Sequence, residues 1–284
     1  MGTQSSSSTA KAPKTVRSTV NYVHPMAERL FYYSSLSDPP PGKPRTNEQA
    51  DARAVTVHDC RPDADRLSLD VEGFEIASGQ WAQADYDDAD DIRRVCYPEV
   101  AAVVKAKTGA SHVILYEHQT RRQYEAPPDL SKALPYRQPV WRVHNDQTPS
   151  SGPQLVREFI GDDAEELLKR RYSFINLWRP LKKPVFDSPL GICDARTISF
   201  EDFIGADQIS PVRTQEMFSA VFNPNHRWCY FPQVELDEAI LLKCFDSEES
   251  GVARFGLHAA FVDPTSPKGA PLRQSIEFRA IAFF

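Results

Sequence analysis

The chain has 284 residues, a formal net charge of -6 and an isoelectric point near 5.7. The acidic balance argues against a nucleic-acid or anionic-membrane partner, which would need a basic surface, and no apolar run reaches the roughly 18 residues of a membrane-spanning helix. The length suits one large core, so we expect a single domain over residues 19–284. Residues 1–18 are rich in Ser, Thr and Lys, and we expect a disordered tail there.

The cysteines indicate the redox environment of the protein. The chain has five of them, an odd number, widely spaced and without a Cys-x-x-Cys pair. This pattern favours free thiols over a disulfide framework or a zinc site, because both of those need closely spaced or paired cysteines. We therefore expect the protein to be cytoplasmic.

The first half of the chain is predicted to combine strands with one long helix. Alternating side chains predict strands at residues 53–58 and 66–77. An acidic run then provides a favourable N-terminus for a helix over residues 92–108, which Gly109 ends. The compact apolar run 111–118 predicts a buried strand.

The second half is predicted to be mainly β. Residues 140–143 alternate like a strand, and helices are predicted at 152–160 and 162–171. Further strands are predicted at 173–178, 191–196, 228–231, 239–245, 254–261 and 275–284. Short strands after a more helical first half favour a mainly β fold with flanking helices, with a β-sandwich or jelly-roll core lying mainly within residues 110–284.

The triplet His144-Asn145-Asp146 is the most informative motif. Residues i and i+2 of a strand face the same side, so the side chains of His144 and Asp146 can reach one ion. Two imidazoles and one carboxylate on one face of a metal leave the opposite positions open, as in non-haem Fe(II) oxygenases. Two downstream histidines can complete such a set: His258 lies in a strand-like run, and His226 lies in a turn sequence that makes it a looser anchor.

A second motif lies near the C-terminus. Arg273 and Ser275 share a strand face with Glu277 and Arg279 by the same period of two. An arginine with a nearby hydroxyl can bind a carboxylate through a two-pronged fork and one further hydrogen bond. A dicarboxylic co-substrate could chelate the metal at one end and reach this pair at the other, which favours His258 as the third ligand. Arg279 is the alternative to Arg273, and either arginine could instead pair with Glu277.

Several phrases in the chain carry a family resemblance. They are His144-Asn-Asp-Gln-Thr, Ile175-Asn-Leu-Trp-Arg-Pro-Leu, His226-Arg-Trp-Cys-Tyr-Phe-Pro, Asp237-Glu-Ala-Ile-Leu-Leu-Lys, His258-Ala-Ala-Phe-Val-Asp-Pro and Arg273-Gln-Ser-Ile-Glu-Phe-Arg. In this order they resemble the Fe(II)/2-oxoglutarate-dependent dioxygenases, specifically the hydroxylase/desaturase family of the AsaB and CmcJ type, which includes gibberellin-desaturase-like enzymes. The resemblance runs from about Tyr22 to the C-terminus and is densest after Val140.

The resemblance implies a double-stranded β-helix (jelly-roll or cupin-like) core that binds Fe(II), with 2-oxoglutarate and dioxygen as co-substrates. It implies an enzyme of fungal-type secondary metabolism that oxidises a bulky apolar intermediate, such as a terpenoid, by hydroxylation, desaturation, endoperoxidation or rearrangement. Succinate and carbon dioxide would be the co-products. The sequence departs from the family where Ala259 and Ala260 follow the distal histidine, a place that often holds a polar residue.

Other side chains are candidates for the same site, each with an ordinary structural alternative. Tyr116 could lend its hydroxyl to the co-substrate carboxylate. Asn176 and Trp178 share one face of their strand and could line the pocket, although core packing is the ordinary role of Trp178. His226 and Trp228 are candidates for contacts with substrate or for hydrogen bonds to the metal ligands.

Two other functions remain compatible with the sequence. One is a non-catalytic partner subunit of such an oxygenase, and the other is a dioxygen-independent, cupin-like isomerase or binding protein. A small-molecule substrate is expected in the leading interpretation, and the assembly could be a homodimer or a pair with a homologous subunit. Hydroxylation and desaturation begin with the same hydrogen abstraction, so the motifs do not choose between them.

Overall fold

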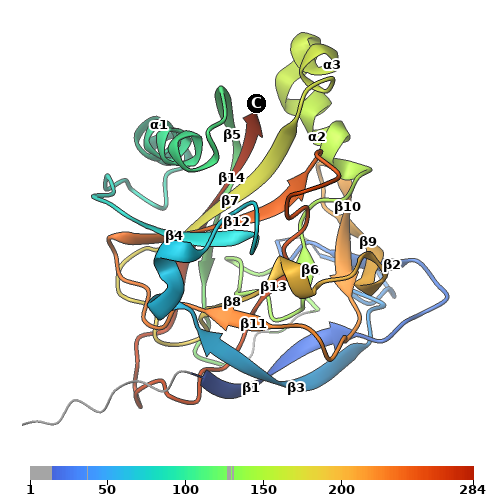
Figure 1. Ribbon diagram of the computed structural model, residues 1–284. Helices are drawn as coiled ribbons and strands as arrows, with labels where there is room; N and C mark the ends of the chain where they lie inside the picture. Colours follow the sequence, from blue (N-terminus) through green and yellow to red (C-terminus); the bar gives the residue numbers. More distant parts are fainter. Residues whose placement is uncertain (1–14, 37, 127–128, 130) are drawn as a thin grey trace, which may run out of the picture.

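The computed structural model describes residues 15–36, 38–126, 129 and 131–284, and its core consists of two curled β-sheets that face each other (Figure 1). The first sheet has nine strands, which are, in spatial order, β1 (Thr15–Val23), β3 (Ala50–Asp59), β11 (Trp228–Tyr230), β8 (Leu190–Cys193), β13 (His258–Ala260), β6 (His144–Asn145), β10 (Thr214–Ala220), β9 (Phe203–Ile209) and β2 (Leu30–Tyr33). Its strand pairs are antiparallel except for β11 with β3 and β2 with β9.

The second sheet has five strands and faces the first. In spatial order they are β4 (Phe74–Ser78), β12 (Glu238–Asp246), β7 (Tyr172–Pro180), β14 (Gln274–Phe283) and β5 (His112–Arg122). The helices are α1 (Ala89–Thr108), α2 (Ser151–Ile160) and α3 (Ala164–Leu167), with short 3-10 helices at Arg61–Arg66, Gly161–Asp163, Ala195–Thr197 and Phe200–Asp202. The predicted mainly β fold with flanking helices and a jelly-roll core is confirmed.

Helix α1 covers the outer face of the five-stranded sheet (Figure 1). The Asp88 side chain caps two amides of its first turn, and Gly109 ends it in the left-handed conformation at φ 72. Apolar residues at helical spacing, from Ile92 to Val104, form its buried stripe. The predicted helix over residues 92–108 is therefore confirmed, with its start at Ala89.

Strand β14 contributes to two layers because alternate side chains point to opposite faces. Ile276 and Phe278 join the hydrophobic cluster beneath α1. Glu277 and Arg279 are also buried but point the other way, and Arg279 reaches Asp146 beside the nine-stranded sheet. The space between the sheets is therefore lined by polar groups from β14.

Two predicted elements in the flanks were wrong in extent. The predicted strand at 66–77 is paired only in its last part, because a tight turn precedes it: Ser68 O accepts the Glu72 amide, and Gly73 has φ 85. The predicted helix at 162–171 is split into a 3-10 turn and α3. After Leu168 the amides of Lys169 and Arg170 bond three residues back, which closes the helix before β7.

The sheets extend beyond the expected core region. Strands β1 to β4 all precede residue 110 and belong to the two sheets. The expected tail is too long, because residues 15–18 are part of β1, where Val16 and Val20 are buried and the strand pairs with β3. The remainder of that expected tail, residues 1–14, lies outside the described residues.

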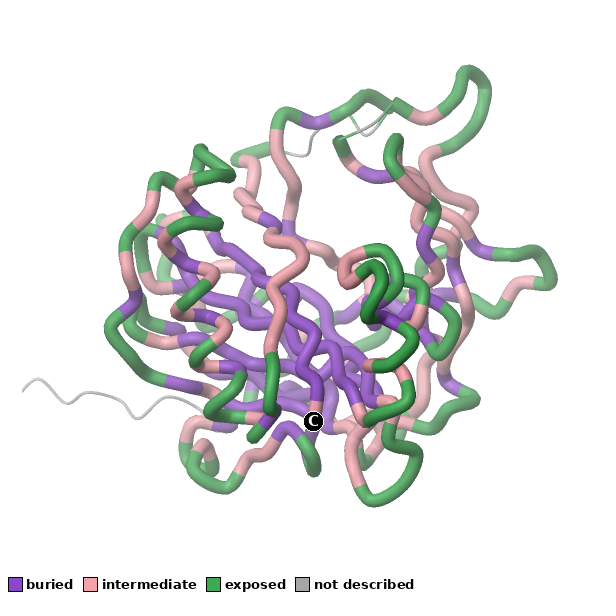
Figure 2. Tube along the Cα trace, turned by 90° about the horizontal axis from the view of Figure 1, so that it is seen from above, coloured by how far each residue is buried: buried purple, intermediate pink, exposed green. Residues whose placement is uncertain are grey.

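The strands that carry the key histidines are shorter than predicted. Residues 140–143 are not a regular strand: they make an isolated bridge at Arg142 and accept a hydrogen bond from the Ala260 amide at Val140 O, and β6 begins at His144 itself. In the run 254–261 only His258–Ala260 is paired. Figure 2 shows the buried residues gathered in the central strands, with exposed residues in the surrounding loops and on the helices. No described helix has both the length and the hydropathy to cross a membrane.

Candidate metal centre

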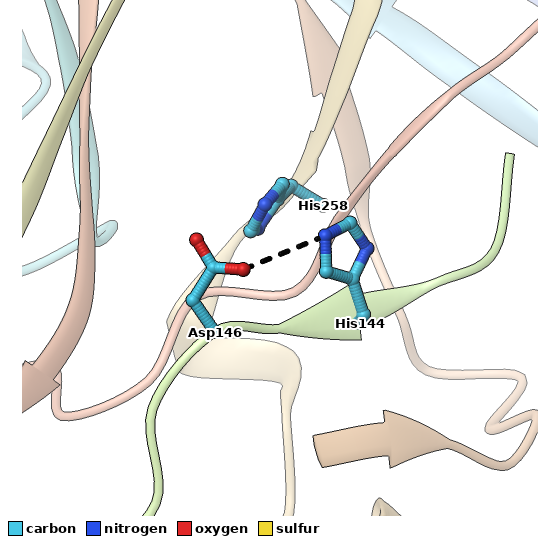
Figure 3. A group of neighbouring side chains, drawn as sticks. All are labelled: His144, Asp146 and His258. Carbon is cyan, nitrogen blue, oxygen red and sulfur yellow. Dashed lines mark ion pairs between the residues drawn. The ribbon is translucent and has the colours of Figure 1, made fainter. Parts of the chain in front are cut away.

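His144, Asp146 and His258 converge between the two sheets (Figure 3). Strand β13 pairs with β6 so that His258 lies directly opposite His144, and their ring centroids are 4.2 Å apart. Asp146 follows β6 and turns its carboxylate toward both rings. One ligand atom from each residue lies within 4.8 Å of the others, and all three residues are buried. This donor set fits a divalent transition metal such as Fe(II).

The backbone fixes the orientation of both imidazoles. His144 Nδ1 lies 2.8 Å from Arg142 O, and His258 Nδ1 lies 3.2 Å from Gly256 O. When Nδ1–H donates to a carbonyl, the Nε2 lone pair is left for a metal. Burial, reinforced by the neighbouring His258, lowers the pKa of His144 well below its ordinary value, so the ring is neutral and able to bind a metal.

Two side chains of the five-stranded sheet hold the Asp146 carboxylate. Asn176 Nδ2 donates to Asp146 Oδ2 at 2.7 Å, and Arg279 Nη2 lies 3.0 Å from the same oxygen. The other oxygen, Oδ1, is 3.8 Å from His144 Nε2 (Figure 3). Burial opposes ionisation of Asp146, but the charge of Arg279, together with the hydrogen bond from Asn176, outweighs it and holds the pKa of Asp146 below its ordinary value. Asp146 is therefore an oriented, ionised ligand with one oxygen aimed at the histidines.

Arg279 was predicted as an alternative anchor for 2-oxoglutarate, and the structure gives it a different place. Its guanidinium contacts Asp146, Glu277 at 3.0 Å and Glu117 at 3.2 Å. Since three protein carboxylates already take its N–H groups, Arg279 orients a metal ligand and has no free edge for a co-substrate.

Of the two candidate anchors Arg273 and Arg279, Arg273 is the one that remains available. Its Nε donates to Ser275 Oγ at 3.1 Å, its Nη1 donates to Ser188 O at 2.7 Å, and its guanidinium lies 4.9 Å from the centre of the Trp178 ring. Among the described residues it has no carboxylate partner, and burial together with Arg121 lowers its pKa to about 9. It lines a small cavity together with both histidines. A buried cation beside a metal site is suited to bind a ligand carboxylate.

The structure also shows residues that the motifs did not reveal. Ser188 has a positive φ of 51, which is uncommon for a residue with a side chain, and its carbonyl positions Arg273. Asn145 donates to Gln147 O and Cys244 O and so fixes the turn between the metal ligands. Asn145 could have been noticed from the sequence because it lies between His144 and Asp146, whereas the sequence around Ser188 contains no signal of its role.

Three predicted site residues lie elsewhere or have other partners. His226 was the alternative ligand, but its Nδ1 is 2.8 Å from Tyr22 Oη and its Nε2 is 3.0 Å from Asp202. Trp228 donates to the same Tyr22 hydroxyl, so both belong to a separate network at the β1 side of the nine-stranded sheet. Tyr116 accepts a hydrogen bond from Gln147 and packs against the core, which is a structural role instead of the predicted contact with the co-substrate.

A second, larger cavity of about 310 Å³ adjoins the metal ligands from the other side. Its apolar walls include Tyr32, Trp141 and Met217, and His144 and Asp146 lie on its inner surface. The two candidate ligands therefore face a space with the volume of an organic small molecule. The predicted pocket role of Trp178 is replaced by support of Arg273, because Trp178 is buried beneath that guanidinium.

Comparisons with known proteins agree with this geometry. A family model described as an oxidoreductase/YMDC permease-like domain matches residues 20–283. The Fe(II)/2-oxoglutarate-dependent dioxygenase nvfI of Aspergillus novofumigatus is 32% identical over 263 residues, which cover 90% of this chain and 91% of that protein. The hydroxylase/desaturase efuI of Hormonema carpetanum is 30% identical over 290 residues, 95% of each chain.

Solved structures give the same result. A structure of the iron and alpha-ketoglutarate-dependent endoperoxidase NvfI superposes with a TM-score of 0.82 at 31% identity, covering 95% of this chain and 98% of that one. A second structure of that enzyme in a different conformation gives a TM-score of 0.85 at 30% identity, over 97% and 99% of the two chains. The resemblance predicted from the motif phrases is thereby confirmed: the chain belongs to the Fe(II)/2-oxoglutarate-dependent dioxygenases that include these fungal hydroxylase/desaturase enzymes.

Proposed function

We propose that this chain is an active oxygenase in which His144, Asp146 and His258 bind Fe(II) and Arg273, with Ser275, anchors the distal carboxylate of 2-oxoglutarate. The convergence of the three ligand atoms within 4.8 Å of one another carries this proposal. A partner subunit without catalysis would not need the complete ligand set, the oriented carboxylate and the adjoining cavity together.

The protein residues have distinct tasks in this proposal. Fe(II) with bound 2-oxoglutarate supplies the activation of dioxygen, with succinate and carbon dioxide as co-products and a hydrogen atom removed from the substrate. Asn176 and Arg279 hold Asp146 in place, so its carboxylate does not need to reorient when ligands bind. Both histidines present Nε2, because their Nδ1 atoms face backbone carbonyls, and Arg273 neutralises the far end of the keto acid.

The larger cavity is proposed to hold the organic substrate. Its aromatic and thioether walls suit the bulky, largely apolar intermediate that the family resemblance implies. The five cysteines are free and buried, which supports a reducing, cytoplasmic location. A homodimer is the assembly that we expect by default.

The test is spectroscopic and does not require the natural substrate. Fe(II) and 2-oxoglutarate are added to the purified protein without oxygen, and the weak visible charge-transfer band of the chelated keto acid is recorded. We expect a band that is lost in His258→Ala and kept in His226→Ala, because His226 binds Tyr22 and Asp202 instead. Arg273→Met should keep iron but need roughly 10- to 100-fold more 2-oxoglutarate. A wild-type protein with bound iron and no band would contradict the proposal.

A further inference from the structure

The larger cavity contains more positive charge than the metal site explains. Among the arginines that line it, Arg142 is paired with Glu48 at 2.8 Å and Arg279 with Asp146 at 3.0 Å. The charge of each of these two arginines is therefore matched by at least one carboxylate. Arg121 and Arg137 line the same cavity, and neither has a carboxylate within ion-pair distance among the described residues.

Arg121 and Arg137 are neighbours whose bonds all go to neutral groups. An isolated β-bridge joins the two residues. Arg121 donates to Gln138 O at 3.0 Å and to Gln119 Oε1 at 2.8 Å, and Arg137 Nη1 lies 3.5 Å from Ser34 Oγ. Two adjacent guanidinium groups without an anion are unfavourable, and their free energy falls when an anion arrives.

The electrostatic environment of Arg137 supports this description. Burial, with Arg121 beside it, lowers the pKa of Arg137 to about 10, so the group stays charged at neutral pH but at a cost. Glu117 is the carboxylate that opposes this effect, and it is already paired with Arg279 at 3.2 Å and Arg213 at 3.7 Å. Glu117 therefore contacts two other arginines and makes no ion pair with Arg137.

The positions of the two arginines separate them from the proposed co-substrate site. Arg121 lines both the small cavity of Arg273 and the larger cavity. Arg137 lines the larger cavity and an adjoining one, but not the small cavity. Since Arg273 accounts for the distal carboxylate of 2-oxoglutarate, the charge of Arg137 serves a different anion.

We propose that the organic substrate carries a carboxylate, which Arg137 binds with Arg121 beside it while the apolar body of the substrate lies against Trp141 and Met217. This inference rests on the proposed function and narrows it from an apolar molecule to an apolar acid. The charge then fixes which end of the substrate lies away from the metal and thus which carbon faces the oxidant.

The test uses acids and their neutral amides as matched probes: benzoate, cyclohexanecarboxylate and 2-naphthoate, each beside its amide. Titration calorimetry is done without oxygen on protein already loaded with Fe(II) and 2-oxoglutarate, so that the metal and Arg273 are occupied. We expect at least one acid to bind about tenfold or more tightly than its amide, the effect of a charge-assisted bond in a shielded site.

Variants then assign the preference to Arg137. Arg137→Gln should remove it, and Arg137→Lys, which keeps the charge but not the fork, should retain part of it. Arg254→Gln is the matched control, because Arg254 is a half-buried arginine over Phe245 and Phe255 and does not line this cavity. Its acid preference should equal that of the wild type. A thermal melt checks that each variant is folded.

Each remaining outcome overturns the inference. If no acid of the series binds more tightly than its amide, or if the preference survives Arg137→Gln, the cavity does not select a carboxylate through this residue. If Arg137→Gln instead weakens the charge-transfer band of 2-oxoglutarate, Arg137 belongs to the co-substrate site. Absence of that band in the wild type would count against the proposed function, and repeating the titration on metal-free protein would still decide the acid preference separately.

Discussion

The hydrogen bond from Asn176 to Asp146 should contribute measurably to metal affinity and to stability. Asn176→Ala removes a 2.7 Å bond between buried groups while Arg279 stays on the same carboxylate oxygen. A hydrogen bond to a charged group is worth about 1.5–3 kcal/mol. Asn176 Oδ1 is buried without a partner, so its removal offsets part of the loss and places the expected destabilisation near the lower end of that range.

Metal affinity should fall as well, because the freed carboxylate can rotate about its remaining contact. Loss of a residue that orients a metal ligand typically lowers affinity by about 10- to 100-fold. We would measure binding of Co(II), a redox-stable substitute for Fe(II), by competition with a coloured chelator, and unfolding by urea titration of the metal-free protein.

A matched control lies on the same strand. Ser173 in β7 is fully buried, and its Oγ has no hydrogen-bond partner, so Ser173→Ala removes a polar atom without breaking a bond. Its metal affinity should equal that of the wild type, and its free energy of unfolding should stay the same or rise. If Asn176→Ala binds Co(II) as tightly as Ser173→Ala, Asn176 does not orient Asp146 for metal binding, and our reasoning about the held carboxylate is wrong.

Two further predictions concern the backbone and pH. A Cβ at Gly256 would lie 2.7 Å from Lys243 O, so Gly256→Ala should shift the segment before His258, weaken metal binding and destabilise the fold by about 1–3 kcal/mol. Gly79 has open space around it, so Gly79→Ala should change neither metal binding nor stability. Urea midpoints and Co(II) titrations of the two variants test this prediction. Burial lowers the pKa values of His118, His144 and His226 in the folded state, so below about pH 6.5 the unfolded chain binds more protons than the folded one. The urea midpoint of the metal-free protein should therefore fall from pH 7.5 to pH 5.5, and a midpoint that rises over this interval would show that other groups dominate.

The sequence predicted the strands that are buried on both faces, and of the less buried strands it predicted β3 and β5 but missed β9 and β10. Strands β7 and β14 are nearly continuous runs of buried residues, and their apolar content made them recognisable. Strands β9 and β10 each contain acidic and amide side chains, and β9 is mostly half-buried, so the apolar signal is diluted. Their place in the sheet depends on pairing with each other and with β6, which no local pattern contains.

The candidate ligands were predictable because two of them lie only two residues apart in the sequence. His144 and Asp146 stand in one triplet, and the choice of His258 over His226 followed from strand-like and turn-like surroundings. The roles of Asn176 and Arg279 were not predictable in the same way. They reach Asp146 because β14 pairs with β7 in a register that sets Arg279 opposite Asn176, and a shift by one residue would turn both away from the metal site.

Strand geometry also explains why the two C-terminal arginines cannot exchange roles. Arg273 and Arg279 lie six residues apart on one face, which in an extended chain corresponds to about 20 Å. Glu277 lies between them and binds Arg279, so the acidic partners gather at one end of this face and leave the other end positive. Along this strand face, a dicarboxylate chelating the metal therefore meets free positive charge only toward Arg273, where Ser188 O and Ser275 already hold the guanidinium in place. The direction in which the co-substrate lies is thus determined by where β14 places its carboxylates as much as by where it places its arginines.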